Sequence, residues 1–141
     1  MSAGTPPGAP RPPDLTAPAP RGWESVHFAE RAPDAEALGA AGVRVAALDA
    51  AAIGSKQELM AALSEALEFP DYFGGNWDAL DECLRDLGSW HEQRGHAVVI
   101  EHGEELWRRE PELAGMLVRS WIDAGAAWAE KGVPFHLVFV R

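Results

Sequence analysis

Three short apolar runs, well separated along the chain, most constrain the fold that this sequence can adopt. They cover residues 43–48, 97–100 and 135–140. Apolar runs of this length are typical of strands that are buried on both faces. Stretches with helical patterns separate them, and strands that alternate with helices pair in parallel through right-handed crossovers. The sequence therefore predicts an α/β layered fold.

The first helix expected between these strands has a well-marked start. Ser55 has the position of an N-cap, and Glu58 follows three residues later, which is the pattern of a capping box. Pro70 ends the helix, because proline lacks a backbone N–H. A second helix is expected from an N-cap at Asn76 to about Leu87. The first helix is expected to bury the side that carries Leu59, Leu63 and Leu67.

Four further elements are expected toward the two ends of the folded part. Residues 104–109 and 112–130 have helical patterns, and Pro111 is tolerated in the first turn of the longer helix. On the N-terminal side, residues 23–28 are typical of a short strand and residues 34–41 of a short helix. The pattern leaves open whether the fold includes this extra N-terminal strand and helix.

The N-terminal part of the chain differs in composition from the rest. Residues 1–22 are dominated by Pro, Ala and Gly, which offer little to bury. We expect a disordered tail over residues 1–22 and a single domain over residues 23–141. A chain of 141 residues is long enough for one domain with its own core, and it is too short for two domains of ordinary size.

The charge of the chain excludes one class of partner. It has 22 acidic residues against 12 Lys and Arg, a formal net charge of -10. A surface of this charge repels a phosphate backbone, so we expect no direct binding of nucleic acid. A basic protein is the more natural partner.

One cysteine and the absence of long apolar segments indicate the compartment. Cys83 has no second cysteine to pair with, which suits a reducing environment. The N-terminus lacks the apolar region of a signal peptide, and no stretch has the roughly 20 apolar residues of a membrane span. We therefore expect a cytoplasmic protein that does not bind a membrane.

The helix after Gly75 has two unlike sides when its residues are projected at about 100° each. The side expected to face the core carries Leu80, Cys83, Leu84 and Leu87. The opposite side carries Asp78, Asp81, Glu82 and Asp86. Arg85 neutralises this second side only in part. A charged outer side is common to amphipathic helices, so the acids alone do not identify a binding site.

Large aromatic residues lead into this helix and strengthen the case for a site. Tyr72, Phe73 and Trp77 surround a glycine-rich turn next to the acids. Aromatic side chains beside charges are typical of the centre of a protein-binding surface. Core packing is the alternative for these aromatics, and it is the one we expect for Phe73.

Residues 69–84 carry a specific resemblance. The segment Phe-Pro-Asp-Tyr-Phe-Gly-Gly-Asn-Trp-Asp-Ala-Leu-Asp-Glu-Cys-Leu resembles the signature of the barstar family. The order of strands and helices over roughly the last hundred residues is also similar. The resemblance implies a barstar-like layered fold, with a three-stranded parallel sheet flanked by helices. It further implies an intracellular inhibitor, monomeric when free, that blocks the active site of a basic, secreted guanyl-type ribonuclease.

The resemblance also assigns expected partner-binding residues. Tyr72 matches the family's aromatic contact, and Asp78 and Glu82 match the two helix acids that enter the enzyme's basic cleft. We expect these carboxylates to take the place of RNA phosphates. The residues that shape the loop and its rim are Gly74, Asn76 and Trp77, and Asp81 adds charge beside them.

Three positions depart from the family's namesake. Glu82 stands where it has an aspartate, which adds one methylene of reach. Asp81 replaces a tryptophan, so charge increases and an aromatic contact is lost. The acid of the penultimate helix aligns, without gaps, to Ala127. Asp123 lies one turn earlier on the same side, and we do not count it among the site residues.

Catalysis and cofactors are not expected. No serine lies in a nucleophile motif, and Cys83 falls on the buried side of its helix. The five histidines lack the spacing of metal ligands, and we expect surface or loop positions for them. Two alternatives stay open beside the inhibitor. One is an acidic interaction module for a basic partner that is not a nuclease, and the other is a metal enzyme that uses the carboxylates.

Overall fold

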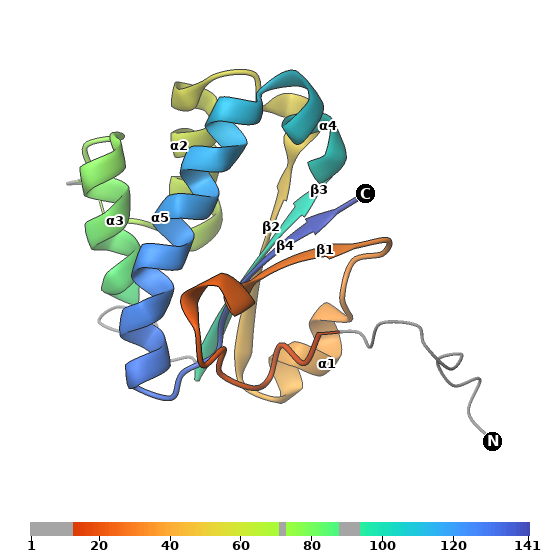
Figure 1. Ribbon diagram of the computed structural model, residues 1–141, viewed down its shortest axis with the longest axis vertical. Helices are drawn as coiled ribbons and strands as arrows, with labels where there is room; N and C mark the ends of the chain where they lie inside the picture. Colours follow the sequence, from red (N-terminus) through yellow and green to blue (C-terminus); the bar gives the residue numbers. More distant parts are fainter. Residues whose placement is uncertain (1–12, 71–72, 88–93) are drawn as a thin grey trace.

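The sheet of the computed structural model, which describes residues 13–70, 73–87 and 94–141, has four parallel strands (Figure 1). The strands are β1 (Val26–Ala29), β2 (Val43–Asp49), β3 (Gly95–Glu101) and β4 (Phe135–Val140). Their order in the sheet is β1-β4-β3-β2. The α/β fold and the three expected strands are confirmed. Burial on both faces holds for β3 and β4 but not for β2, because β2 is an edge strand with buried and exposed positions. The expected three-stranded sheet gains a fourth strand, because β1 pairs with β4, with Val26 opposite Leu137.

Helices cover both faces of the sheet. In Figure 1, α2, α3 and α5 lie on one face, and α1 lies on the other. No helix within the described ranges is long and apolar enough to cross a membrane. The helices are α1 (Ala35–Ala40), α2 (Lys56–Leu67), α3 (Trp77–Arg85), α4 (Gly103–Arg109) and α5 (Pro111–Glu130). Two short 3-10 helices, η1 (Gly22–Ser25) before β1 and η2 (Ala50–Ala52) after β2, complete the fold.

The start of α2 confirms the capping box in a modified form. The Ser55 hydroxyl accepts a hydrogen bond from the Glu58 N–H at 3.1 Å. The Glu58 carboxylate accepts from the N–H of Gly54, at 3.1 Å, one residue before the usual partner. The helix ends at Leu67, before Pro70, because Glu68 turns into the left-handed region with φ 54°.

The main core fills the space between the sheet and the helices α2, α3 and α5. Trp121 of α5 stacks on Phe135 of β4, with ring centroids 3.9 Å apart. Gly103 allows α4 to approach β4, since a β-carbon at this position would lie 2.8 Å from that of Phe139. This core holds α5 in a fixed position against the sheet, which matters because α5 forms one side of the site described below.

The second core lies on the opposite face and includes part of the expected tail. Leu15 is only 3% exposed and belongs to a cluster with Leu38 and Val138. The Ala17 carbonyl accepts a hydrogen bond from His136 Nε2 at 2.7 Å. The boundary expected at residue 22 is therefore too late, because apolar side chains between residues 13 and 22 pack on the sheet. Residues 1–12 lie outside the described part.

Two of the histidines are buried, contrary to the expectation of surface or loop positions. His96 is 1% exposed in β3, and His136 is 3% exposed in β4. His136 Nδ1 lies 2.9 Å from Nε2 of His27 in β1. Because His136 Nε2 donates to the Ala17 carbonyl, neutral His136 accepts at Nδ1, and His27 is the donor. His91 falls outside the described ranges.

Candidate partner-binding site

The turn before α3 sets where the helix begins. Gly75 has φ 70°, a conformation that favours glycine. The side-chain oxygen of Asn76 accepts a hydrogen bond from the Ala79 N–H at 2.8 Å, which confirms Asn76 as the N-cap. Gly74 has no such requirement, because a β-carbon there would make ordinary contacts. Tyr72, the expected aromatic contact, lies outside the described residues.

The inner side of α3 is anchored in the core. Leu80, Cys83 and Leu84 are buried, as the sequence predicts. The indole N–H of Trp128 in α5 donates to the Leu84 carbonyl at 2.8 Å and joins the two helices. Burial raises the pKa of the Cys83 thiol, and the nearby Glu82 and Asp86 carboxylates raise it further. Cys83 is therefore an unreactive core residue, and the outer side of α3 rests on a fixed support.

The outer side of α3 carries the expected acids in different environments. Asp78 and Glu82 are exposed. The Asp81 side chain is 36% exposed and pairs through Oδ2 with Arg85 at 3.4 Å. Its other oxygen, Oδ1, is buried and has no hydrogen-bond partner within the described ranges. Asp81 thus retains an unused acceptor where α3 meets its neighbour.

A groove runs between α3 and α5, and we call it the acidic groove. It has a volume of about 240 Å³. The two helices supply its lining, which consists of Trp77, Asp78 and Asp81 from α3 and Met116, Arg119, Ser120 and Asp123 from α5. The lining therefore contains three carboxylates from two helices and one guanidinium group. The groove suits a cationic group that can bind several carboxylates at once.

The geometry of α3 separates the two acids that were expected to act together. Relative to Asp78, Asp81 is turned by about 60° toward one side of the helix, and Glu82 by about 40° toward the other. Asp78 and Asp81 line the acidic groove, whereas Glu82 does not. The structure thus brings together Trp77, Asp78 and Asp81, and it leaves Glu82 exposed next to the groove.

Asp123 is the residue that the sequence analysis passed over. It is exposed on α5 and lines the acidic groove with Asp78. The ungapped alignment pointed instead to Ala127, which is half-buried. A usable signal was present, because Met116, Arg119 and Asp123 recur every three or four residues beside the buried stripe of α5. What was missing was the knowledge that α3 packs beside this stripe.

The remaining aromatic residues near α3 belong to the core. Phe73 packs against Phe69, with ring centroids 4.9 Å apart, which confirms the expected core position. Trp128 is buried and stacks on Phe135. Trp77 is the aromatic residue from this part of α3 that reaches the groove. Within the described ranges, no group of three or more Asp, Glu, His or Cys side chains could hold a metal ion.

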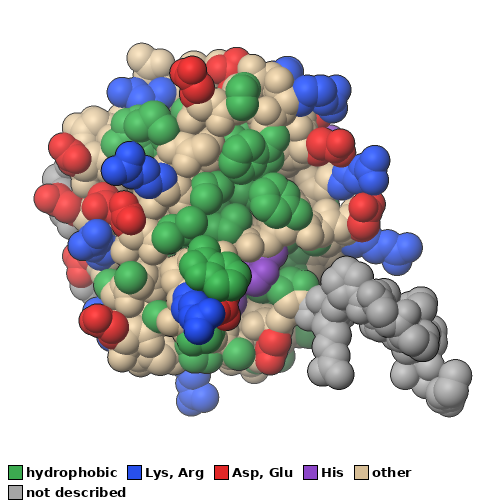
Figure 2. Space-filling view, in the orientation of Figure 1, with side chains coloured by type: hydrophobic (Ala, Val, Ile, Leu, Met, Phe, Trp, Pro, Cys, Tyr) green, Lys and Arg blue, Asp and Glu red, His purple; other side chains and the backbone are tan. Residues whose placement is uncertain are grey.

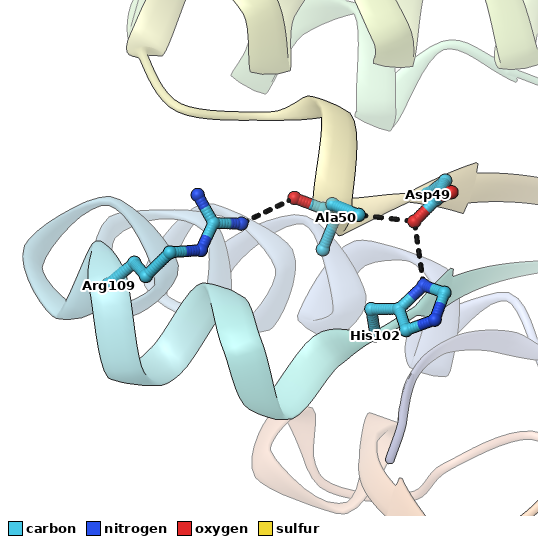
Figure 3. Close-up of polar contacts among 5 residues, drawn as sticks. Asp49, Ala50, His102 and Arg109 are labelled. Carbon is cyan, nitrogen blue, oxygen red and sulfur yellow. Dashed lines mark hydrogen bonds and ion pairs between the residues drawn. The ribbon is translucent and has the colours of Figure 1, made fainter.

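A second polar cluster lies at the carboxyl ends of β2 and β3 (Figure 3). The Asp49 carboxylate is 2.8 Å from His102 Nδ1 and also accepts the Ala51 N–H. Asp49 raises the pKa of His102, and these hydrogen bonds lower the pKa of Asp49. Arg109 donates to the Ala50 carbonyl at 2.9 Å. The cluster joins η2 to α4, and Figure 1 places α4 and α3 on opposite sides of α5.

Comparison with protein families assigns most of the chain to a known family. A family model described as "Barstar (barnase inhibitor)" matches residues 43–140. This range contains β2, β3, β4, all of α3 and α5, and hence the whole acidic groove. It leaves out η1, β1 and α1. No curated protein matches the chain.

Proposed function

The chain belongs to the barstar family, and from this premise we propose that it inhibits a basic, guanyl-type ribonuclease by inserting the acids of α3 and α5 into the active site. The observation that carries the proposal is the acidic groove, where Asp78, Asp81 and Asp123 converge beside Trp77. We propose no catalytic role for the chain.

The mechanism follows from the groups that a ribonuclease needs for RNA. Its active site presents cations that bind phosphate, and a carboxylate can form charge-assisted hydrogen bonds to the same cations. Because the core fixes α3 and α5, the backbone that carries the carboxylates is positioned before the enzyme arrives. Little backbone freedom is then lost on binding. Substrate is excluded because the two ligands compete for one set of cations.

We assign distinct parts to the acids. Asp78 and Asp123 face the groove from opposite helices and form its central pair. Asp123 takes the part of the acid that the family's namesake supplies from its penultimate helix. Glu82 lies outside the groove and uses its longer side chain to reach a neighbouring cation. Tyr72 extends the contact surface through its aromatic ring.

The charge of the whole chain contributes to the speed of binding. A net charge of -10 attracts a cationic enzyme over long distances. Added salt screens this attraction, so the association rate is expected to fall as ionic strength rises. Fast capture suits a partner that would cut RNA in the cytoplasm, where we propose the protein acts.

Titration of the protein into an assay of barnase, a basic guanyl-type ribonuclease, tests the proposal. We expect stoichiometric loss of RNA cleavage. The double variant Asp78→Asn and Asp123→Asn should inhibit far less, because both central carboxylates lose their charge. Glu36→Gln is the matched control, since it removes an exposed carboxylate from α1 on the other face of the sheet.

Two results would contradict the proposal. One is full ribonuclease activity at an excess of the folded wild-type protein. The other is equal inhibition by the double variant and by Glu36→Gln. If the protein fails to inhibit but still binds a basic protein through the acidic groove, the alternative of an interaction module for a non-nuclease partner replaces the inhibitor.

A further inference from the structure

A second groove lies between β1, β4 and α4, outside the site described above. We call it the aromatic groove, and its volume is about 600 Å³. Phe28, Trp107 and Phe139 form its apolar wall, and Glu30, Glu104 and Arg141 form its rim. Phe28 belongs to β1, which precedes the residues that match the family model. The groove in this form therefore depends on the N-terminal addition to the family's domain.

Phe28 is the exposed part of the aromatic wall, Trp107 is half-buried and Phe139 is buried. Phe28 is 69% exposed and stacks on Phe139, with ring centroids 5.3 Å apart. Trp107 lies 6.0 Å from Phe28 and 5.4 Å from Phe139, centroid to centroid. Figure 2 shows hydrophobic side chains gathered near the centre of one face of the molecule. The free energy falls when another segment covers an apolar surface of this kind and removes it from water.

The rim of the aromatic groove carries excess negative charge. Arg141 pairs with Glu30 at 3.3 Å and with Glu104 at 3.1 Å. Two carboxylates therefore share one guanidinium group, and one negative charge remains. A segment that fits the groove would bring apolar contact area and one positive charge.

The chain itself contains such a segment at residues 1–12. This segment has four prolines, and Arg11 is its single charged side chain. Proline-rich segments favour the polyproline II conformation and dock in grooves lined by aromatic side chains. Arg11 lies between two prolines, so it can reach acids at a rim while its neighbours contact the rings. We propose that residues 1–12 dock in the aromatic groove of the same molecule, with Arg11 at Glu30 and Glu104.

The attachment point of the segment makes this contact possible. Leu15 is buried in a cluster that includes Val140 and the partly buried Ala29. Ala29 also lines the aromatic groove, and it belongs to β1, the edge strand of the sheet. The segment would pass around this edge from one face of the sheet to the other, and packed layers lie roughly 10 Å apart. Twelve residues in polyproline II conformation span roughly 37 Å, which is ample.

A nitroxide spin label near the N-terminus tests the proposal in the full chain. The variant Ala3→Cys provides the attachment point, because Cys83 is buried and its pKa is raised, so it should resist labelling. We expect NMR line broadening at the Trp107 indole N–H and the Phe28 amide. The Trp77 indole N–H, which lies at the acidic groove, serves as the reference.

Two substitutions in the labelled chain separate docking from mere proximity. Arg11→Glu places a like charge against the rim and should remove the selective broadening at Trp107. Lys56→Glu makes the same charge change at the exposed start of α2 and should leave it unchanged. The proposal is overturned if Trp107 and Trp77 are broadened equally, or if Arg11→Glu has no effect.

A mixing experiment distinguishes the segment of the same molecule from that of a second copy. Spin-labelled chains without ¹⁵N are mixed with ¹⁵N chains without a label. We expect the Trp107 signal in this mixture to stay sharp. Broadening of Trp107 in the mixture would place a second copy's segment in the groove and overturn the assignment to the same molecule.

Discussion

The acidic groove and the aromatic groove of this protein differ in chemistry and in origin. The acidic groove lies wholly within residues 43–140 and is lined mainly by charged side chains. The aromatic groove depends on Phe28, outside that range, and has an apolar wall. Each groove is built on an element anchored in the core: Leu84 is fully buried in α3, which supplies one side of the first, and Phe139 is buried in the wall of the second.

The difference in chemistry indicates which kind of occupant each groove binds. Carboxylates in water are well solvated, so the acidic groove can remain open until a cationic partner replaces the water. Burying an exposed aromatic ring lowers the free energy whichever apolar group contacts it. The aromatic groove therefore favours an occupant that is always present. The first groove suits an encounter with another molecule, and the second suits a segment of the same chain.

The largest expected effect concerns the support beneath the acidic groove. Leu84→Ala should lower the free energy of unfolding by about 2 to 5 kcal/mol, because Leu84 is fully buried and leaves a cavity. Urea unfolding followed by circular dichroism measures the change. A loss within experimental error would show that α3 does not depend on this contact.

The next effect concerns the acids and leaves the fold intact. Asp78→Ala and Glu82→Ala should each weaken ribonuclease binding by about 2 to 5 kcal/mol, mostly through faster dissociation, if their carboxylates are desolvated against cations. Surface plasmon resonance measures the rates, and urea midpoints should stay unchanged. Unaltered affinity in both variants would move the binding site elsewhere on the molecule.

A smaller effect is expected for the acid on α5. Asp123→Asn should weaken ribonuclease binding by about 1.5 kcal/mol, since the amide keeps an acceptor but loses the charge. Surface plasmon resonance measures the affinity, and Ala127→Ser, at the position indicated by the ungapped alignment, should show little change. Reversed sensitivities at these two positions would restore the ungapped alignment and remove Asp123 from the groove's function.

The mildest test concerns how the N-terminal addition, which builds the aromatic groove, is held to the sheet. Burial and the neighbouring His136 lower the pKa of His27 from 6.5 to about 4. Between these values the unfolded chain binds a proton that the folded chain does not, so stability should fall as pH decreases from 6.5 to 4. Urea midpoints across this range measure the slope.

The matched variant for this test is His27→Gln. Its amide can still donate to His136 Nδ1 but does not titrate. The fall in stability between pH 6.5 and 4 should be shallower in this variant than in the wild type. Identical slopes would exclude His27 as a source of the pH dependence.

The fold could be predicted where local signals and tertiary packing agree. The three apolar runs form β2, β3 and β4. Asn76 caps α3 because its side-chain oxygen can accept a hydrogen bond from the Ala79 N–H. The segment from residue 13 to 22 was misjudged, because its composition is poor in apolar residues. Leu15 is nevertheless buried against one face of the sheet, and Ala19 is buried as well, which composition does not reveal.

The site could be predicted only in part, for a geometric reason. A helical projection places Asp78, Asp81 and Glu82 on the outer side of one helix, but it does not show which neighbour stands beside them. The packing of α5 against α3 brings Asp123 to the groove and leaves Glu82 outside it. Contacts between helices distant in sequence decide such details, and local periodicity carries no information about them.

A crystal structure of the protein bound to a barnase-type ribonuclease would show directly whether the acidic groove enters the active site. We expect the carboxylates of Asp78 and Asp123 to lie within hydrogen-bond distance of cationic side chains in the enzyme's active site, with Trp77 covered. A complex in which the acidic groove faces solvent, and the enzyme rests on another surface, would contradict the proposed function.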